Sequence, residues 1–281
     1  MTARILDGRR IARAVREDLT RQAEEARSRL GFPAGLAIAR VGGDAASTVY
    51  SHALVRASEA VGMSATLVTL PEDTDDAALR ACLLALNADD RAHGVLMQLP
   101  LPPHLSQRLV AETIEPRKDV DGISMRSAGN LFLRLPSFVP STCAAVIEIL
   151  ERADVPLSGK RAVVVGASNV VGKPLSFMLL HRDATVTVCH IHTRDLGYWT
   201  RQADVLVVAV GKPNLITGAM VKPGATVVDV GINVREGGEL VGDVEFESVV
   251  EVAGALTPVP GGVGQLTNLM LLKQTLIASA L

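Results

Sequence analysis

The feature that most constrains the fold of this 281-residue chain is the segment 161–176, which reads RAVVVGASNVVGKPLS. Its apolar run ends at Gly166 and predicts a strand buried on both faces of a parallel sheet. A helix is predicted to begin near Gly172, where free N–H groups could hold a phosphate that Gly166 allows to approach. The segment therefore predicts a dinucleotide-binding domain of the Rossmann type. Because the pattern is G-x-S-x-x-x-G rather than G-x-G-x-x-G, a plain strand–glycine–helix turn is the alternative for the loop alone.

Three further apolar segments of the second half end near a glycine or a polar loop, as strands of the same sheet would: residues 185–189, 205–210 and 226–230. Helices fit between them, and this alternation favours the dinucleotide-binding interpretation over an isolated turn. Residues 136–142 are predicted to form a domain boundary, followed by a helix over about 143–152. The run 266–281 predicts a C-terminal helix.

The first half alternates helical and strand patterns. The expected helices cover residues 9–30, 47–61 and 74–87, the last with Thr74 or Asp75 as its N-cap, and the expected strands cover residues 35–41, 65–70 and 94–98. This order indicates a second parallel sheet with helices on its faces. We therefore expect an α/β protein with a catalytic domain over 1–139, a Rossmann-type domain over 140–265, and a C-terminal helix over 266–281 that returns to the first domain.

The bulk composition excludes several classes of protein. Hydrophobic residues make up 48% of the chain and charged residues 21%, which favours a large core over disorder. The net charge of -2 gives no indication of a nucleic-acid partner or an anionic membrane surface. The three cysteines, Cys82, Cys143 and Cys189, form no CxxC pair and are expected to be buried free thiols, with no metal site. Without an apolar leader or a long apolar span, the chain is expected to be cytoplasmic with no membrane partner.

Seven other segments accompany the glycine-flanked loop: residues 5–8 (ILDG), 41–50 (VGGDAASTVY), 95–102 (VLMQLPLP), 118–122 (KDVDG), 208–213 (VAVGKP), 228–233 (VDVGIN) and 257–264 (TPVPGGVG). In this order and at this spacing, they resemble the motifs of the methylenetetrahydrofolate dehydrogenase/cyclohydrolase family over nearly the whole chain. The resemblance implies an NAD(P)-dependent oxidoreductase that acts on one-carbon derivatives of tetrahydrofolate. It also implies a homodimer.

The resemblance assigns Tyr50, Gln98 and Asp121 to a folate cleft as candidate catalytic residues. A carboxylate at position 121 can accept two N–H groups from the pterin edge, and an amide at position 98 can donate and accept near the one-carbon unit. A core tyrosine, a turn-forming aspartate and a plain Gly/Pro turn are the simpler alternatives for Tyr50, Asp121 and residues 260–262. The implied substrate-binding residues are Ser47, Tyr50, Gln98, Leu99, Pro100, Asp121, Pro260, Gly261 and Gly262.

The implied cofactor-binding residues are Gly166, Ala167, Ser168, Val171, Gly172, His190, Ile191, Gly211 and Ile232. No acid that could hold the ribose hydroxyls of NAD precedes Asp195, which favours NADP, with NAD as the alternative. Family members place a serine or an arginine for the 2′-phosphate where this chain has Ile191. The neighbouring His190, His192 and Arg194 could supply positive charge instead, or could be ordinary loop residues.

The chain departs from the family most clearly at Leu54, because the family carries a lysine four residues after the tyrosine. Arg56 projects about 200° away on a helix and cannot replace it, and His52 lies on another face. Removing hydride from an N–CH2–N carbon requires alignment more than a base, whereas adding water to the methenyl form requires proton transfer. We therefore expect the dehydrogenase reaction to be retained and the cyclohydrolase reaction to be weak or absent. Two other family motifs also differ, at residues 140–145 (PSTCAA) and 262–267 (GVGQLT).

Other hypotheses remain open at this point. A folate- or nucleotide-binding paralogue with little catalysis is favoured by Leu54 and Ile191 and opposed by the intact Tyr50, Gln98 and Asp121. A dehydrogenase for another substrate would use Leu54 as part of an apolar pocket. A generic hydroxy-acid dehydrogenase is a weaker alternative, because no His–Asp or His–Glu relay can be placed.

Overall fold

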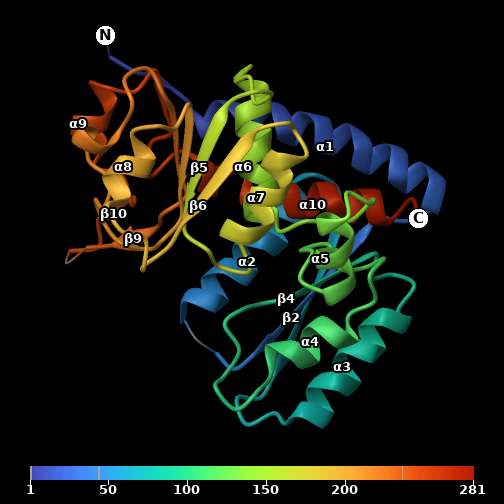
Figure 1. Ribbon diagram of the computed structural model, residues 1–281. Helices are drawn as coiled ribbons and strands as arrows, with labels where there is room; N and C mark the ends of the chain where they lie inside the picture. The colour runs from blue at the N-terminus through green and yellow to red at the C-terminus, as the bar shows by residue number, and fades with distance from the viewer. Residues whose placement is uncertain (1, 44, 236) are drawn as a thin grey trace. The chain divides into compact units, whose positions relative to one another are not determined.

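The computed structural model of the chain describes residues 2–43, 45–235 and 237–281. The chain divides into two compact units (Figure 1). Unit 1 consists of residues 1–13 and 142–267, and unit 2 of residues 14–141 and 268–281. The chain passes from one unit to the other after residues 13, 141 and 267, so both units are built from two separate stretches of the chain.

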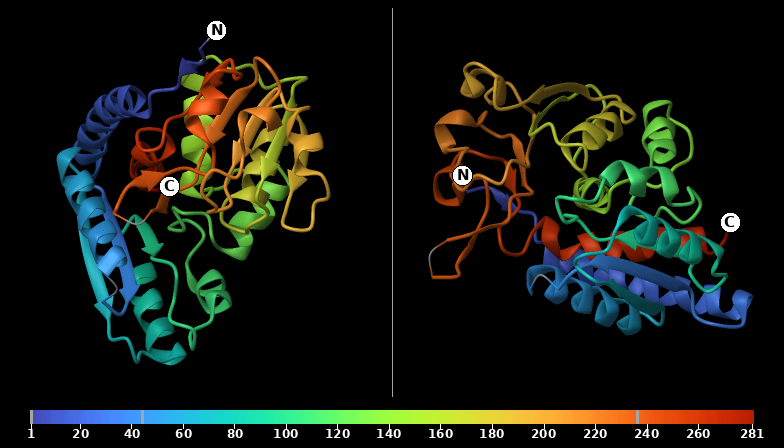
Figure 2. Two further views of the ribbon diagram at one scale, coloured as in Figure 1. Left: turned by 90° about the vertical axis from the view of Figure 1, so that its left-hand side faces the viewer. Right: turned by 90° about the horizontal axis from the view of Figure 1, so that it is seen from below.

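Unit 1 is formed around a six-stranded parallel sheet, which confirms the predicted Rossmann-type domain (Figure 2). Its strands, in spatial order, are β1 (Arg4–Ile5), β11 (Ala255–Leu256), β8 (Thr226–Asp229), β7 (Val205–Val208), β5 (Arg161–Val165) and β6 (Thr185–Cys189). The helices of this unit include α6 (Ser141–Arg152), α7 (Gly172–Leu180), α8 (Leu196–Thr200) and α9 (Phe246–Val250). Apolar side chains of β5, β7 and β8 form the buried core.

The strands of unit 1 differ from the predictions in two respects. The strands β5, β7 and β8 end one or two residues earlier than their apolar patterns suggested, because the last residues turn into loops at the carboxyl edge. The two-residue strands β1 and β11 were not predicted, nor was the antiparallel hairpin of β9 (Asn233–Val234) and β10 (Leu240–Val241). Segments this short have no periodicity to recognise, and β1 forms only through its distant partner β11.

Unit 2 contains a three-stranded parallel sheet in the order β3 (Ser64–Leu70), β2 (Gly35–Val41), β4 (Gly94–Met97). Its helices are α2 (Ala45–Ala60), α3 (Asp76–Ala88), α4 (Gln107–Thr113), α5 (Met125–Phe132) and α10 (Thr267–Ala278), and the long α1 (Gly8–Leu30) contributes most of its length. The helices α3 and α4 lie side by side (Figure 1) and pack their leucines against β2 and β4. Every helix and strand predicted for this half is present within a few residues of its expected ends.

Local expectations were mostly confirmed. Asp75 rather than Thr74 caps α3, with its carboxylate accepting the Ala78 N–H at 2.7 Å. Of the three free cysteines, Cys143 and Cys189 are buried, but Cys82 is only half-buried, so the expectation of a buried thiol was wrong there. Cys82 lies on α3, where its neighbour Leu83 instead points into the core. Within the described ranges, no helix combines the length and the apolar character needed to cross a lipid bilayer.

Candidate active site

Unit 2 brings Ser47 and Gln98 into direct contact. The Gln98 amide follows β4 and is only 7% exposed. Its Nε2 donates to the Ser47 carbonyl at 2.9 Å, and its Oε1 accepts a hydrogen bond from Ser51 Oγ. The sequence interpretation missed Ser51, although Ser51 lies one helical turn after Ser47 on the same face of α2. The two serines therefore fix the orientation of the amide that was predicted to face the one-carbon unit.

Asp121 and Tyr50 are electrostatic neighbours in the same unit. Burial, together with the charge of nearby Asp119, raises the pKa of Asp121 to about 6, although the Ser141 N–H donates to its carboxylate at 3.0 Å. Burial and the charge of Asp121 raise the pKa of the Tyr50 phenol to about 12. At neutral pH the site therefore holds an ionised carboxylate beside a neutral phenol, so the phenol can donate a hydrogen bond but cannot act as a base.

The two aspartates of the KDVDG segment have different roles. Asp119 is fully buried and accepts the N–H groups of Ile123 and Ser124 at 3.0 and 2.8 Å, and the Ser127 hydroxyl at 2.6 Å. These bonds fold the turn that leads into α5. Asp119 is therefore the turn-forming carboxylate of this segment. Asp121 makes one backbone hydrogen bond, with Ser141, and retains capacity for other donors.

Leu54 is fully buried on α2, whereas His52 and Arg56 are exposed. No cationic side chain of this helix therefore takes the place of the family lysine. Of the other predicted substrate residues in this unit, Leu99 is half-buried and Pro100 is exposed.

The predicted cofactor residues lie at the carboxyl ends of the strands of unit 1. From β5 the chain moves to β6 on one side and then to β7 on the other, so the topological switch point lies between β5 and β7. Gly166 follows β5 and Gly211 lies just after β7. Ser168 Oγ accepts the Val171 N–H at 3.0 Å and so organises the turn into α7. Ala167 is half-buried and Gly172, the first residue of α7, is buried.

Gly166 is also required by the packing of the chain itself. Its φ is +122°, and a Cβ at this position would collide with the Ala209 carbonyl oxygen. The glycine therefore lets two strand ends meet at the switch point, in addition to any approach it allows to a phosphate.

Replacing Gly166 by alanine is expected to lower the free energy of unfolding by about 3 kcal/mol or more, because both φ and the backbone contact are incompatible with a Cβ. Gly211→Ala is the matched control: its φ is +66°, but no atom lies within 4 Å of the added carbon. It should cost only about 1–2 kcal/mol. Chemical denaturation of both variants measures the difference, and equal losses would contradict the role of the Ala209 contact.

The loop after β6 carries no acid toward a ribose. Asp195 adopts a left-handed conformation with φ +47° and caps α8 by accepting the Tyr198 N–H at 3.1 Å. His190 and His192 are exposed, with their rings 6.0 Å apart, and Ile191 is 92% exposed. Asp195 is therefore a helix cap, and the exposed groups at this strand end include two imidazoles, the Arg194 guanidinium and the aliphatic side chain of Ile191.

The loop that contains Pro260, Gly261 and Gly262 belongs to unit 1, whereas Tyr50, Gln98 and Asp121 belong to unit 2. Within unit 1 it borders a cavity of about 150 Å³ together with residues 229–232, including Ile232. The predicted substrate residues 260–262 and the predicted cofactor residue Ile232 thus line one cavity.

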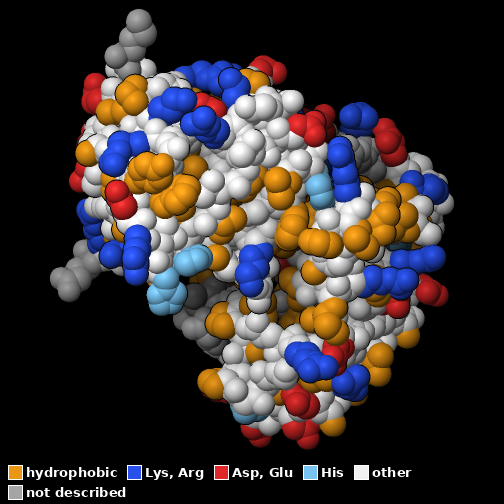
Figure 3. Space-filling view, in the orientation of Figure 1, with side chains coloured by type: hydrophobic (Ala, Val, Ile, Leu, Met, Phe, Trp, Pro, Cys, Tyr) orange, Lys and Arg blue, Asp and Glu red, His pale blue; other side chains and the backbone are white. Residues whose placement is uncertain are grey.

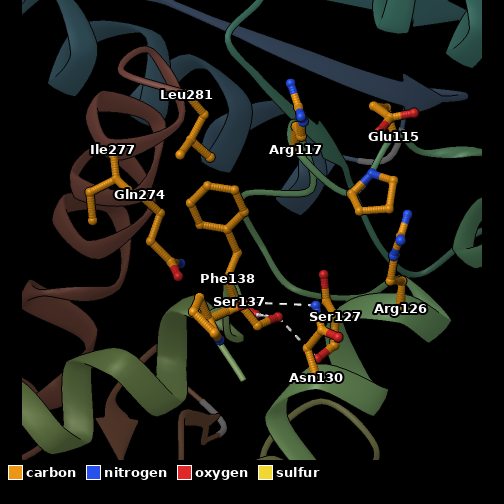
Figure 4. Close-up of a pocket in the computed structure, with 12 residues that line it drawn as sticks. Glu115, Arg117, Arg126, Ser127, Asn130, Ser137, Phe138, Gln274, Ile277 and Leu281 are labelled. Carbon is orange, nitrogen blue, oxygen red and sulfur yellow. Dashed lines mark hydrogen bonds between the residues drawn. The ribbon is translucent and has the colours of Figure 1, made fainter. Parts of the chain in front are cut away.

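A separate cavity of about 570 Å³ lies in unit 2 and is lined by α5 and α10 (Figure 4). Two of its polar side chains are engaged by the chain itself: Gln274 bonds to the backbone of Val120 and Val139, and the Ser127 hydroxyl donates to Asp119. None of the predicted site residues lines it. On the face of the molecule shown in Figure 3, basic and acidic side chains are interspersed.

Comparison with known proteins matches both halves of the chain to one family. Residues 6–121 match the tetrahydrofolate dehydrogenase/cyclohydrolase catalytic domain, and residues 140–281 match the NAD(P)-binding domain of the same family. The bifunctional protein FolD of Variovorax paradoxus is 50% identical over 279 residues, covering 99% of this chain and 98% of the relative.

Solved structures agree with this assignment. The FolD methylenetetrahydrofolate dehydrogenase/cyclohydrolase of Campylobacter jejuni superposes with a TM-score of 0.96 at 43% identity, covering 98% of each chain. The Trypanosoma brucei enzyme, solved with NADP and an inhibitor, gives a TM-score of 0.94 at 36% identity, covering 100% of this chain and 98% of that one. The chain therefore belongs to the tetrahydrofolate dehydrogenase/cyclohydrolase family of NAD(P)-dependent enzymes of one-carbon folate metabolism.

Proposed function

We propose that this protein oxidises 5,10-methylenetetrahydrofolate to the 5,10-methenyl form with NADP, and that its cyclohydrolase activity is weak or absent. The observation that carries the proposal is the combination of a retained Tyr50, Gln98 and Asp121 group with a fully buried Leu54 at the lysine position. The folate half of the site is assigned to unit 2. The cofactor half is assigned to the carboxyl ends of the strands of unit 1.

In this proposal the ionised Asp121 accepts N–H groups from the pterin edge, and Tyr50 lies against its ring as a neutral phenol. The Gln98 amide, fixed by Ser47 and Ser51, faces the one-carbon unit. Loss of hydride leaves a cation that the two flanking nitrogens stabilise, so these residues need only orient the substrate. When bound, NADP supplies the hydride acceptor.

The same residues are poorly suited to hydrolysis of the methenyl form. Water addition and C–N cleavage require a group that takes up and returns a proton near neutral pH. The Tyr50 phenol, with its pKa raised to about 12, stays protonated, and the Gln98 amide does not titrate. Leu54 cannot transfer a proton, and Asp121 is committed to holding the substrate. The dehydrogenase step therefore survives the loss of the lysine better than the cyclohydrolase step.

The proposed cofactor is NADP. The glycine-supported turns at the switch point fit a dinucleotide, and the end of β6 offers His190, His192 and Arg194 with no acid before the helix cap Asp195. The T. brucei relative was solved with NADP, whereas the yeast enzyme of the same fold is described as NAD-dependent. Ile191 contributes no polar group, so NAD remains the alternative that an assay must decide.

We also propose that the protein acts in the cytoplasm and forms a homodimer. Light scattering of the purified protein would test the homodimer.

The purified protein is expected to reduce NADP in the presence of methylenetetrahydrofolate and to hydrolyse methenyltetrahydrofolate no faster than a few times the buffer rate. Formation of reduced nicotinamide with NADP or NAD measures the first reaction, and loss of methenyltetrahydrofolate absorbance measures the second. The C. jejuni relative is a suitable positive control. Rapid hydrolysis would contradict the loss of cyclohydrolase activity. Binding of both ligands without turnover would instead support the paralogue with little catalysis.

A further inference from the structure

Unit 1 contains two buried carboxylates, Asp229 at the end of β8 and Asp243 shortly after β10. Their residues are 3% and 0% exposed. Among the described residues, neither forms an ion pair with a lysine or an arginine. A charged group buried without a counter-ion is costly unless hydrogen bonds satisfy it, so the partners of these carboxylates reveal what they are for.

Asp243 is saturated by four N–H donors. Its Oδ2 accepts the backbone N–H groups of Val210 and Gly211 at 2.6 and 2.9 Å. Its Oδ1 accepts the backbone N–H of Lys212 at 2.8 Å and the Asn233 side-chain amide at 2.9 Å. Three consecutive amides of the loop after β7 thus point at one carboxylate, which fixes the backbone of that loop.

Asp229 in turn holds the backbone that carries Asp243. Its Oδ1 accepts the N–H groups of Gly231 and Asp243 at 2.9 and 3.0 Å, and its Oδ2 accepts the Val244 N–H at 2.9 Å. A Cβ at Gly242 would collide with the Asp229 carboxylate. The close approach of carboxylate and backbone is therefore built into the sequence, and Asp229 couples the loop after β8 to the segment of Asp243.

The loops organised by this pair follow β7 and β8 at the carboxyl edge of the sheet, where dinucleotides bind in such folds. They include the predicted cofactor residues Gly211 and Ile232, and Asp229 also borders the 150 Å³ cavity beside Ile232. We propose that Asp243 is a positioning residue for the cofactor, which sets the backbone of residues 210–212 before NADP binds, with Asp229 holding Asp243 in place. The inference rests on the proposed NADP-dependent function.

The test is Asp243→Asn, because asparagine keeps the shape but replaces one acceptor oxygen with an NH2 group that faces N–H donors. The dissociation constant for NADP, measured by calorimetry, is expected to rise about tenfold or more, since hydrogen bonds to a charged acceptor are lost. Amide hydrogen exchange at residues 210–212 should accelerate in the protein without ligand. The KM for methylenetetrahydrofolate at saturating NADP should change by less than about threefold, because the Asp243 carboxylate bonds to residues 210–212 and Asn233 and to none of the predicted substrate residues.

Asp204→Asn is the matched control. Asp204 also accepts a backbone N–H in unit 1, from Arg161 at 2.9 Å, but at the amino ends of β5 and β7. The NADP affinity of the Asp204→Asn protein and its amide hydrogen exchange at residues 210–212 should equal those of the unchanged protein. Asn233→Ala removes one of the four donors to Asp243 and should weaken NADP binding by a smaller factor, about two- to threefold.

The possible results either support or contradict the positioning role of Asp243. A folded Asp243→Asn protein that binds NADP normally overturns the inference, as does equal weakening in Asp243→Asn and Asp204→Asn. If Asp243→Asn does not fold, Asn233→Ala decides: unchanged affinity and unchanged exchange at 210–212 overturn the inference. If the unchanged protein itself does not bind NADP, the proposed function fails rather than the role of Asp243.

Discussion

Asp121→Asn is expected to lower kcat/KM for methylenetetrahydrofolate by about two orders of magnitude. Removing one partner of a buried, hydrogen-bonded charged contact typically costs about 2–5 kcal/mol in binding, which corresponds to roughly 30-fold to several thousand-fold. Asparagine keeps the size of the side chain and an oxygen for the Ser141 N–H, so the loss isolates the charge. Steady-state kinetics with saturating NADP measures it, with Asp76→Asn, an exposed acid on α3, as control.

The pH dependence separates this role from a structural one. Since the pKa of Asp121 is raised to about 6, kcat/KM of the unchanged protein should fall as the pH drops below about 6, and Asp121→Asn should lack this decline. An acid with a raised pKa in the folded state binds protons more tightly there than when unfolded. The favourable contribution of Asp121 to the free energy of unfolding is therefore complete below the ordinary pKa of 3.8 and is lost as the pH rises through about 6.

At neutral pH the buried charge of Asp121 thus lowers the free energy of unfolding by about 3 kcal/mol relative to the protonated form. The Asp121→Asn protein should therefore be more stable at neutral pH than the unchanged protein. This stability advantage should shrink as the pH is lowered toward 4. A variant that is less active yet more stable cannot owe its loss of activity to unfolding. Activity within a few-fold of normal, or an unchanged decline at acid pH, would contradict the assignment of Asp121.

Leu54→Lys is expected to raise the rate of methenyltetrahydrofolate hydrolysis by at least about tenfold, because it restores a group able to transfer a proton one helical turn after Tyr50. The position is fully buried, so burial should lower the pKa of the introduced lysine toward neutrality, where proton transfer is most effective. The same burial should reduce the free energy of unfolding by about 2–4 kcal/mol.

Leu54→Met provides the comparison, since it conserves volume without adding a titratable group and should cost less than about 1.5 kcal/mol. Both variants should retain dehydrogenase activity if hydride loss needs no base. The decisive measurement is cyclohydrolase rate against pH for the two folded proteins. A Leu54→Lys protein that hydrolyses no faster than Leu54→Met would show that the missing lysine is not what limits the second reaction.

The sequence predicted those parts of the molecule that depend on local pattern. The apolar run of β5, the long α1 and the strand β6 were found because each carries its own periodicity or a continuous apolar stretch. Asp75 was recognised as a candidate cap from its place at the start of a helical pattern. The family motifs made Tyr50, Gln98 and Asp121 candidates because each lies within a short, characteristic segment, and their roles stay predictions.

What the sequence could not reveal were contacts between distant residues. Asp119 and Asp121 are two positions apart in one motif. Only the fold shows that the Asp119 carboxylate accepts the hydrogen bonds of the turn into α5. Asp243 bonds to residues 210–212, which lie 31 to 33 positions earlier in the chain. The contact of Ser51 with Gln98 joins a helix to the end of a strand and has no signal in either segment alone.

The pairing of β1 with β11 has a consequence for how the protein is made. Unit 1 requires both residues 1–13 and the stretch up to 267, and unit 2 requires residues 268–281 in addition to 14–141. As the chain emerges from the ribosome, the sheet of unit 2 can pair early, but α10, whose Gln274 bonds to Val120 and Val139, follows only after the whole of unit 1. Unit 1 in turn cannot pair β1 before β11 at residues 255–256 has been made. Both cores therefore stay incomplete, and open to aggregation, until more than 250 residues have been synthesised.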